Sequence, residues 1–248
     1  MPIGFASRIF APRPFTTLLT IALIALLLSL GRWQLRRADE KRALYDAFTA
    51  GTDITRVLDS QTPHLPRYQH LAATGKYDPT RQILIDNMSN AEGHAGYFVI
   101  TPFELRDGGW VLVNRGWVPI GASRAERPPI EVSSGVRELH GRADNLPRAG
   151  IRMGERLRLA PSYPVVANFP THAEIAQLLR DTSWSPATEL VLLDAGEPDG
   201  YRRQWQAPGL PPMRHVAYAV QWFALALTVG VVYVVTNLRR ETAKQRPA

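Results

Sequence analysis

The stretch VAYAVQWFALALTVGVVYVVTNL, residues 216–238, is 23 residues long and contains no Asp, Glu, Lys or Arg. A second uncharged run, PFTTLLTIALIALLLSLG at residues 14–31, has 18 residues. At a rise of about 1.5 Å per residue, helices of these lengths measure roughly 35 and 27 Å, which matches the ~30 Å hydrocarbon core of a bilayer. The sequence therefore predicts two transmembrane helices, close to the two ends of a 248-residue chain.

The basic residues that decide the topology sit at the ends of the chain. Residues 1–14 and 239–248 together hold six Lys and Arg against one Glu, whereas residues 32–214 are nearly neutral, with 23 basic and 21 acidic residues. Short basic flanks stay in the cytoplasm, and a long loop is translocated largely regardless of its charge. We therefore expect a multi-pass protein of the bacterial inner membrane, with cytoplasmic segments 1–14 and 239–248, spans at 15–31 and 216–238, and a periplasmic domain at 32–214. Because topology explains the net charge of +7, membrane lipid is expected as a partner and nucleic acid is not.

Two features of the first span leave alternatives open. Arg32 and its basic neighbours follow the span directly and oppose this orientation if only the flanks of that span are compared. The SLG triplet at 29–31 resembles a small-x-small cleavage site, so a cleaved signal peptide is the competing interpretation. The apolar run is longer than a usual signal-peptide core, which favours a retained helix.

Between the spans the hydrophobic period changes from helical to strand-like. Residues 32–50 are expected to continue the first helix as an amphipathic helix that stops at Gly51. Asp107-Gly108 predicts a tight hairpin, because this pair supplies the positive φ values of a primed turn. Strands are expected at residues 69–77, 81–88, 96–105, 109–118, 136–142 and 188–194.

One helix is predicted within this domain. Thr171 and Glu174 have the spacing of a capping box and open a helix through Arg180. The chain is therefore predicted to be a membrane protein whose two transmembrane helices flank an α+β extracytoplasmic domain with a mainly antiparallel sheet.

Several kinds of chemistry are poorly supported by the sequence. The absence of cysteine excludes disulfides, thiolate metal sites and CxxC redox chemistry, and no nucleophile elbow, HExxH or P-loop occurs. His64 and His70 are expected to be loop residues rather than metal ligands. Asp86, Glu92 and His94 are expected to be polar hairpin residues rather than an acid–base cluster. We therefore expect no enzymatic activity.

A sharper pattern lies at the outer end of the second span. His215, Tyr218 and Trp222 follow an i, i+3, i+7 spacing, which places them on one helical face. An imidazole at a membrane boundary can be an axial ligand of haem iron, and aromatic rings can cover the macrocycle. Arg214, and Arg32 or Arg36 across from it, could pair with haem propionates. The alternative is an interfacial aromatic belt with a polar histidine at the level of the lipid headgroups.

Two further motifs have no clear chemistry of their own. LGRWQLRR at 30–37 ends the first apolar run and by itself indicates an interfacial anchor. VNRGWVP at 113–119 places an Arg and a Trp at a strand end, which indicates a sheet edge with a glycine bulge. The motif residues of uncertain role are Gly31, Trp33, Gln34, Arg115, Gly116 and Trp117.

Together these motifs resemble those of the Surfeit-locus family of cytochrome c oxidase assembly factors. LGRWQLRR, the GKY triplet at 75–77, VNRGWVP and RHVAYAVQWF at 214–223 occur in the family's order and spacing from Leu30 to Ala226. The resemblance implies a two-span, non-enzymatic assembly factor for the aa3-type oxidase. Such a protein would hold haem a transiently and assist its insertion into cytochrome c oxidase subunit I, with haem A synthase as a second candidate partner.

The resemblance also assigns candidate haem-binding residues. In several bacterial members the histidine of the second-span motif is the haem ligand, and that position here is His215, the one expected contact to haem iron. Tyr218, Trp222 and Arg214 are implied as supporting residues, although many relatives carry Asn where this chain has Arg214. For the motif around Arg115 we expect a structural role, and contact with a partner protein is the second candidate. The sequence does not distinguish binding of haem a from binding of haem o. Two hypotheses compete with the haem carrier: a cofactor-free scaffold and a membrane-anchored periplasmic enzyme.

Overall fold

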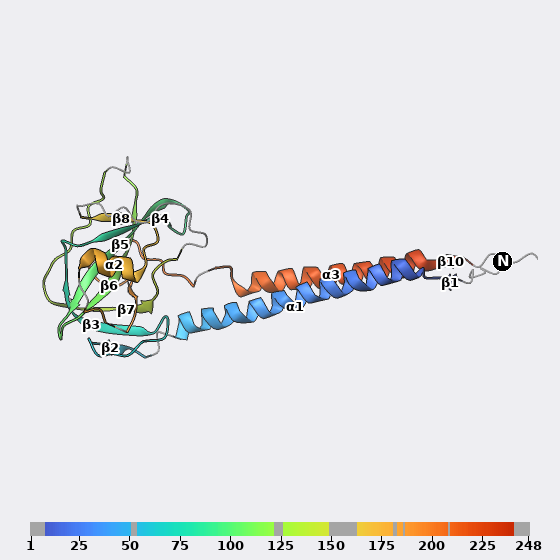
Figure 1. Cartoon of the computed structure of the whole chain (residues 1–248), viewed down its shortest axis with the longest axis horizontal. Helices are drawn as coiled ribbons and strands as arrows, with labels where there is room; N and C mark the ends of the chain where they lie inside the picture. The colour runs from blue at the N-terminus through green and yellow to red at the C-terminus, as the bar shows by residue number, and fades with distance from the viewer. Residues whose placement is uncertain are drawn as a thin grey trace, which may run out of the picture. The chain divides into compact units, whose positions relative to one another are not determined.

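The structure is a computed structural model that describes residues 8–50, 54–121, 126–148, 163–180, 183–185, 187–207 and 209–240. The chain divides into two compact units: Met1–Tyr45 with Pro208–Ala248, and Asp46–Ala207. The long helices belong to the first unit and the large sheet to the second (Figure 1). The predicted helix stop at Gly51 lies outside the described residues, as do most of the two predicted cytoplasmic tails.

Two helices, α1 (Pro14–Ala50) and α3 (Pro212–Asn237), dominate the first unit and run side by side (Figure 1). Both are long and apolar enough to cross a membrane. Helix α1 continues unbroken from the predicted span into the predicted amphipathic segment, as expected. Much of the apolar surface is exposed, with Phe15 77% and Leu227 70% accessible. Because soluble proteins rarely expose contiguous apolar surface on this scale, the helices are consistent with a membrane protein.

The two helices meet along a seam of small residues. On α1 the buried positions are Leu27, Gly31 and Ala38, and on α3 they are Ala219 and Ala226. Spacings of four and seven residues keep one face of each helix toward its partner. Small side chains let helix backbones approach closely, which is the usual way in which helices pack within a bilayer.

A two-stranded antiparallel sheet lies next to the N-terminal end of α1 and the C-terminal end of α3. Strand β1 (Arg8–Phe10) pairs with β10 (Leu238–Arg240), with Arg8 opposite Arg240. One helical turn further in, the hydroxyls of Thr17 and Tyr233 share a hydrogen bond of 2.6 Å. The described parts of the basic N-terminal and C-terminal flanks therefore lie together.

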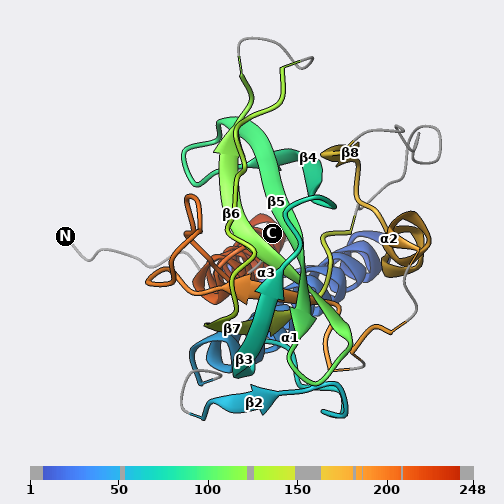
Figure 2. The same cartoon turned by 90° about the vertical axis from the view of Figure 1, so that its left-hand side faces the viewer.

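The second unit contains an eight-stranded sheet in the order β2-β3-β7-β9-β6-β5-β4-β8 (Figure 2). Its strands are β2 (Arg56–Leu58), β3 (His70–Tyr77), β4 (Ile83–Ser89), β5 (Ala95–Leu105), β6 (Trp110–Pro119), β7 (Arg137–Asp144), β8 (Val165–Ala167) and β9 (Leu190–Leu193). A further pairing between β3 and β5 closes β3, β7, β9, β6 and β5 into a barrel. Strand β5 belongs both to the barrel and to the β4–β8 extension of the sheet. Its first half pairs with β4, and its last residues pair with β3.

This sheet is mixed: five of its pairings, β3–β5 among them, are antiparallel and three are parallel. The six expected strands are present, and the pairs β3–β7, β4–β5, β5–β6 and β7–β9 are antiparallel. Three pairs, β2–β3, β4–β8 and β6–β9, are parallel. In each parallel pair a short strand of three or four residues adds to a strand that is not its hairpin partner. The hairpin signals in the sequence carried no information about these pairings.

The hairpin between β5 and β6 is confirmed, but its turn differs from the prediction. Positive φ values occur at Gly108 (91°) and Gly109 (88°), one residue later than the predicted pair. Asp107 instead accepts hydrogen bonds from the backbone NH and the hydroxyl of Ser60, at 2.8 and 2.7 Å. The acidic side chain therefore ties the turn to a neighbouring loop, and the two glycines provide the left-handed backbone.

Alternating side chains divide the core between the two faces of the strands. Val191 lies in the barrel cluster, and its neighbour Leu192 lies in a second cluster on the other face. Helix α2 (His172–Leu179) covers that second face with Ile175 and Leu179. Its predicted capping box is present, since Thr171 and Glu174 bond each other's backbone NH groups.

Candidate functional site

The two motifs at the outer ends of the predicted spans meet between α1 and α3. His215 Nδ1 lies 2.9 Å from Gln34 Oε1, although 181 residues separate the two in sequence. An amide oxygen only accepts hydrogen bonds, so Nδ1 is the donor in this pair. The contact fixes both the orientation of the ring and the nitrogen that carries the proton. Gln34, a motif residue without an assigned role in the sequence, therefore positions His215.

The other ring nitrogen of His215 has no partner among the described residues. Nε2 is buried, and no hydrogen bond satisfies it. In the neutral ring with its proton on Nδ1, Nε2 carries the lone pair, and this is the form of histidine that binds a metal. A buried polar atom without a partner normally costs free energy, so such an atom in a structure needs an explanation. A metal bond to Nε2 is one that fits the chemistry of the ring.

This histidine suits haem iron better than a bare metal ion. Among the described residues no group of three or more His, Asp or Glu side chains could hold an ion. Haem supplies the equatorial nitrogen ligands itself, so one protein imidazole is a sufficient axial ligand. Nε2 is enclosed by protein atoms, and ligation therefore requires neighbouring side chains to move apart.

The other residues predicted for this site are placed unequally. Trp222 is half-buried, whereas Tyr218 and Trp33 are 46% and 51% exposed, and Arg214 is exposed. The spacing rule placed His215, Tyr218 and Trp222 on one face, but Tyr218 points further toward the surroundings than the other two. It remains available for a ligand or for lipid headgroups.

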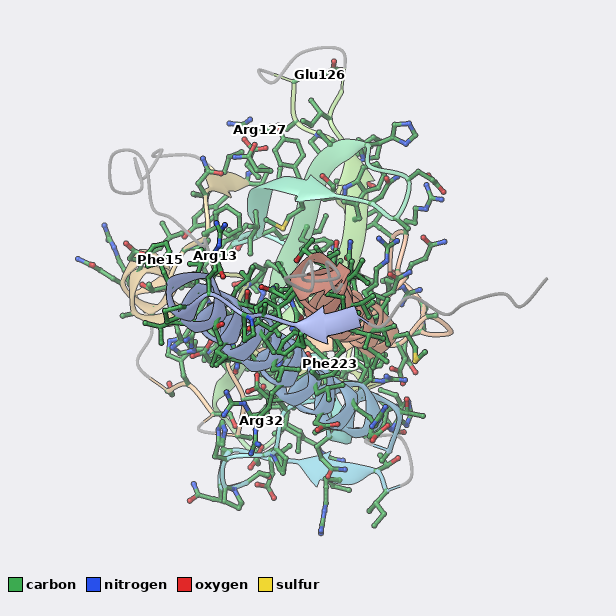
Figure 3. All side chains as sticks on the ribbon, turned by 90° about the vertical axis from the view of Figure 1, so that its right-hand side faces the viewer. Arg13, Phe15, Arg32, Glu126, Arg127 and Phe223 are labelled. Atoms are coloured by element: carbon green, nitrogen blue, oxygen red, sulfur yellow. The ribbon has the colours of Figure 1, made fainter. Side chains whose placement is uncertain are left out.

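Gly31, about one turn from Gln34 on α1, packs against Phe223, about two turns from His215 on α3. A Cβ atom added to Gly31 would lie 2.4 Å from the Phe223 ring, so only glycine allows the present packing. Figure 3 shows Phe223 of α3 beside the ribbon of α1. Sequence reasoning had not identified Phe223 as a contact of the first motif.

Among the histidines outside the motifs, His70 and His94 have hydrogen-bond partners within the second unit. His70 Nε2 lies 2.5 Å from Asp194 and its Nδ1 lies 3.0 Å from Thr55. The backbone NH of His94 donates to Asn90 at 2.9 Å, and His64 is exposed. His70 is the first residue of β3, so its expected place in a loop is wrong, and Asp86 is buried within β4.

In the second unit, Arg115 is a fully buried cation that joins distant segments. Only 1% of the residue is exposed. Its nitrogens donate to the carbonyls of Asp199, Ile130 and Glu131 at 2.8, 3.1 and 2.9 Å. The side-chain oxygen of Gln82 accepts a further bond of 2.8 Å. Burial lowers the pKa of the guanidinium below its ordinary value, an effect partly opposed by nearby tyrosines, but arginine remains charged at neutral pH.

Two tyrosine rings complete the surroundings of this guanidinium. It lies 5.7 Å from the centre of the Tyr77 ring and 5.0 Å from that of Tyr201. Burial raises the pKa of Tyr77 to about 12, so its phenol is neutral at physiological pH. The cation is therefore stabilised by carbonyl dipoles and ring faces, and no carboxylate within the described residues bonds it directly.

Gly116 and Trp117 fix the backbone next to Arg115. The register between β5 and β6 shifts here, so Arg115 and Gly116 together oppose a single residue of β5. Gly116 has φ 115°, and a Cβ atom there would lie 2.9 Å from the Arg202 carbonyl oxygen. Trp117 donates from its ring nitrogen to the Met88 carbonyl at 3.0 Å. The glycine bulge is as predicted, but β6 lies between β5 and β9 and is not a sheet edge.

Comparison with known proteins agrees with these motifs. The family model described as "SURF1 family" matches residues 21–227. A "SURF1-like protein" of Rickettsia felis is 26% identical over 232 residues, which cover 89% of this chain and 96% of that protein. "Surfeit locus protein 1" of Takifugu rubripes is 24% identical over 237 residues, which cover 85% of this chain and 92% of that protein. The match includes most of both long helices and the whole stretch of sequence that forms the barrel, and the chain belongs to the SURF1 family.

Proposed function

We propose that this chain is a non-enzymatic assembly factor for an aa3-type cytochrome c oxidase, and that it carries haem a to subunit I. The SURF1 family is associated with cytochrome oxidase assembly. The observation that carries the haem-binding part is His215, whose Nδ1 is held by Gln34 and whose buried Nε2 has no partner among the described residues. Haem a is the cargo, and its iron supplies the bond to the protein.

The chain's own residues account for holding and release of this cargo. Gln34 keeps the proton on Nδ1 and so presents the Nε2 lone pair. Trp222 and the more exposed Tyr218 offer ring faces nearby on the same helix, and Arg214 offers a charge for a propionate. A single axial bond from one side chain is weaker than a permanent multi-ligand site, which suits transfer to subunit I.

A cofactor-free scaffold is the second candidate function. The enclosure of Nε2 favours it, because no coordination position is open without movement of neighbouring side chains. Deletion of the protein separates the two candidates. Under both, assembled oxidase falls while haem a is still synthesised. Normal amounts of subunit I lacking cofactor support the carrier, whereas loss of the subunit itself supports the scaffold. Unchanged oxidase under all growth conditions would contradict both.

The proposed setting is the bacterial inner membrane, with both helices as spans and the barrel domain in the periplasm. The pairing of β1 with β10 supports it, because it keeps the two basic flanks together. Retention of the first span is supported by its packing, since Gly31 and Thr17 contact α3 directly. Cleavage after Gly31 would remove the part of α1 that packs against α3.

Reporter fusions test the orientation. We expect alkaline phosphatase fused at Gly150 to be active, because the enzyme folds only after export, and a fusion after Ala248 to be inactive. The matched control is a cytoplasm-active reporter at the same two positions, which should give the opposite result. The reverse pattern would place the domain in the cytoplasm. A mature N-terminus at Arg32 would show cleavage of the first span.

The role of Gln34 is tested by two substitutions. Gln34→Leu removes the acceptor of the His215 Nδ1 proton, and we expect haem binding to weaken about 10–100-fold, as for other groups that orient metal ligands. Gln34→Glu keeps an acceptor and should retain binding. Resonance Raman spectra of the ferrous protein should show an iron–histidine stretch at higher frequency in Gln34→Glu, because a carboxylate makes the imidazole more basic. Equal affinities and identical spectra for the three proteins would contradict the positioning role.

A further inference from the structure

A polar pocket lies between the two long helices, at the end of the pair where α1 begins and α3 ends. Its volume is about 540 Å³, within the ~300–1,000 Å³ typical of ligand pockets. Its polar lining consists mainly of Arg13, Thr16 and Thr20 of α1 and of Thr228, Thr236 and Asn237 of α3. A pocket with this lining suits a ligand that carries charge and hydrogen-bonding groups, rather than a hydrocarbon chain alone.

Arg13 is the cation of this pocket, and no acidic residue balances its charge. Its carbonyl accepts the hydroxyls of Thr16 and Thr17 at 3.0 and 2.8 Å, but its guanidinium bonds no other described residue. Residues 8–38 and 209–240 contain no Asp or Glu. The first acid along α1 is Asp39, roughly 39 Å from Arg13 along the helix axis. A guanidinium is therefore available here for the charge of a ligand (Figure 3).

The two-stranded sheet beside the pocket adds further positive charge. Strand pairing places Arg8 of β1 opposite Arg240 of β10. Like charges directly opposite each other in an antiparallel pair destabilise it. The sheet adjoins the pocket, because the backbone NH of Ala11 donates to the carbonyl of the pocket residue Asn237 at 3.0 Å. An anion bound at this end of the helix pair would offset the repulsion.

The pocket threonines indicate what else the ligand carries. Each of the four donates its hydroxyl hydrogen to a carbonyl three or four residues earlier in its own helix. The lone pairs of the hydroxyl oxygens are left to accept hydrogen bonds. The pocket therefore combines a planar cation, which suits a phosphate, with acceptors that suit hydroxyl groups of the ligand.

We propose that this pocket binds the headgroup of phosphatidylglycerol, an anionic phospholipid, in the leaflet at this end of the helices. The phosphodiester lies against Arg13, and the headgroup hydroxyls donate to the threonine oxygens. Phosphatidylethanolamine has the same phosphodiester, but its ammonium group removes the net charge and is repelled by the nearby arginines. Basic pockets between transmembrane helices bind anionic headgroups in other proteins.

This lipid site is separate from the proposed haem site. Arg13 and Gln34 are roughly 30 Å apart along α1. Lipid binding at Arg13 requires that the two long helices span a membrane, but it does not require that the protein binds haem. A bound headgroup would fix the depth of this helix end in the bilayer.

The test is native mass spectrometry of the full-length protein in detergent, titrated with phosphatidylglycerol and phosphatidylethanolamine that have the same acyl chains. We expect the wild type to bind its first phosphatidylglycerol about tenfold more tightly than its first phosphatidylethanolamine. Arg13→Gln removes the charge in the pocket and should reduce this preference to about twofold. Arg42→Gln is the matched control and should keep the tenfold preference. It removes the same charge from the other end of α1, where Arg42 lies 3.4 Å from Asp39.

Two results would overturn the inference. One is equal affinity of the wild type for the two lipids, and the other is the same preference in Arg13→Gln as in Arg42→Gln. Unchanged thermal unfolding of both variants shows that they are folded. Neither result affects haem binding at His215, and we expect Arg13→Gln to keep the haem content of the wild type.

A soluble headgroup distinguishes a lipid from a free phosphate ester. Glycerophosphoglycerol carries the same phosphodiester and hydroxyls without acyl chains. We expect it not to displace bound phosphatidylglycerol at millimolar concentration, because the lipid also packs its chains against the apolar helix surface. Displacement by the soluble compound would assign the pocket to a soluble phosphate ester and would contradict the lipid assignment.

Discussion

His215→Ala is expected to lose haem almost completely, with affinity lowered by more than about 100-fold. The substitution removes the bond to iron that we propose for His215, and packing contacts do not replace a coordination bond. Membrane insertion should persist, because the 23 uncharged residues that follow position 215 are unchanged. The measurement is the haem content and the Soret band of protein purified from cells that make haem a.

The neighbouring aromatic residues provide the control for this prediction. Tyr218→Ala or Trp222→Ala removes a ring face and leaves the metal bond, so we expect a loss of about 1 kcal/mol, or roughly fivefold in affinity. A His215→Ala protein that is inserted, stable and retains haem with an unaltered Soret band would disprove the ligand assignment.

Arg115→Ala is expected to be the most destabilising single substitution discussed here, at about 3 kcal/mol or more. It leaves the carbonyls of Ile130, Glu131 and Asp199 without the donors of Arg115, and it leaves an empty space where the buried guanidinium lies. For a domain of this size that corresponds to a drop in Tm of roughly 6–12 °C. Thermal unfolding of the full chain in detergent, followed by near-ultraviolet circular dichroism, measures the change.

Two variants define what Arg115 contributes. Arg115→Lys keeps the charge but not the planar set of five donors, so it should be destabilised nearly as much as the alanine variant. Arg106→Ala removes an exposed arginine from the β5–β6 turn and should change stability by no more than about 0.5 kcal/mol. If Arg115→Ala unfolded at the wild-type temperature yet impaired oxidase assembly, the motif would be a partner contact rather than a structural element.

The long helices and the local motifs of the fold could be predicted because their signals are local in sequence. Uncharged runs of 18 and 23 residues identified both helices, and the Thr171–Glu174 spacing identified the start of α2. The bulge at Gly116 was predictable for the same reason. Strands β2 and β8, with three residues each, are too short to show an alternating pattern and were not predicted.

The barrel, the Gln34–His215 contact and the contacts of Arg115 depend on residues far apart in the chain. The local sequence pattern does not show such pairings. Closure of β3 against β5 and the parallel pairing of β9 follow from how the chain returns to the sheet. Gln34 meets His215 only because the antiparallel register of α1 and α3 brings them together. The burial of Arg115 runs against the usual exposure of arginine, and nothing around it in sequence indicates its distant carbonyl partners.

A visible spectrum of the purified protein tests whether His215 holds haem a. The full-length protein would be expressed together with the enzymes of haem a synthesis, purified, and examined in its oxidised and reduced forms beside His215→Ala. We expect a haem a spectrum with a histidine-ligated iron in the wild type and its loss in the variant. A wild-type protein that carries no haem while oxidase assembly still requires it would contradict the claim and leave the scaffold as the function.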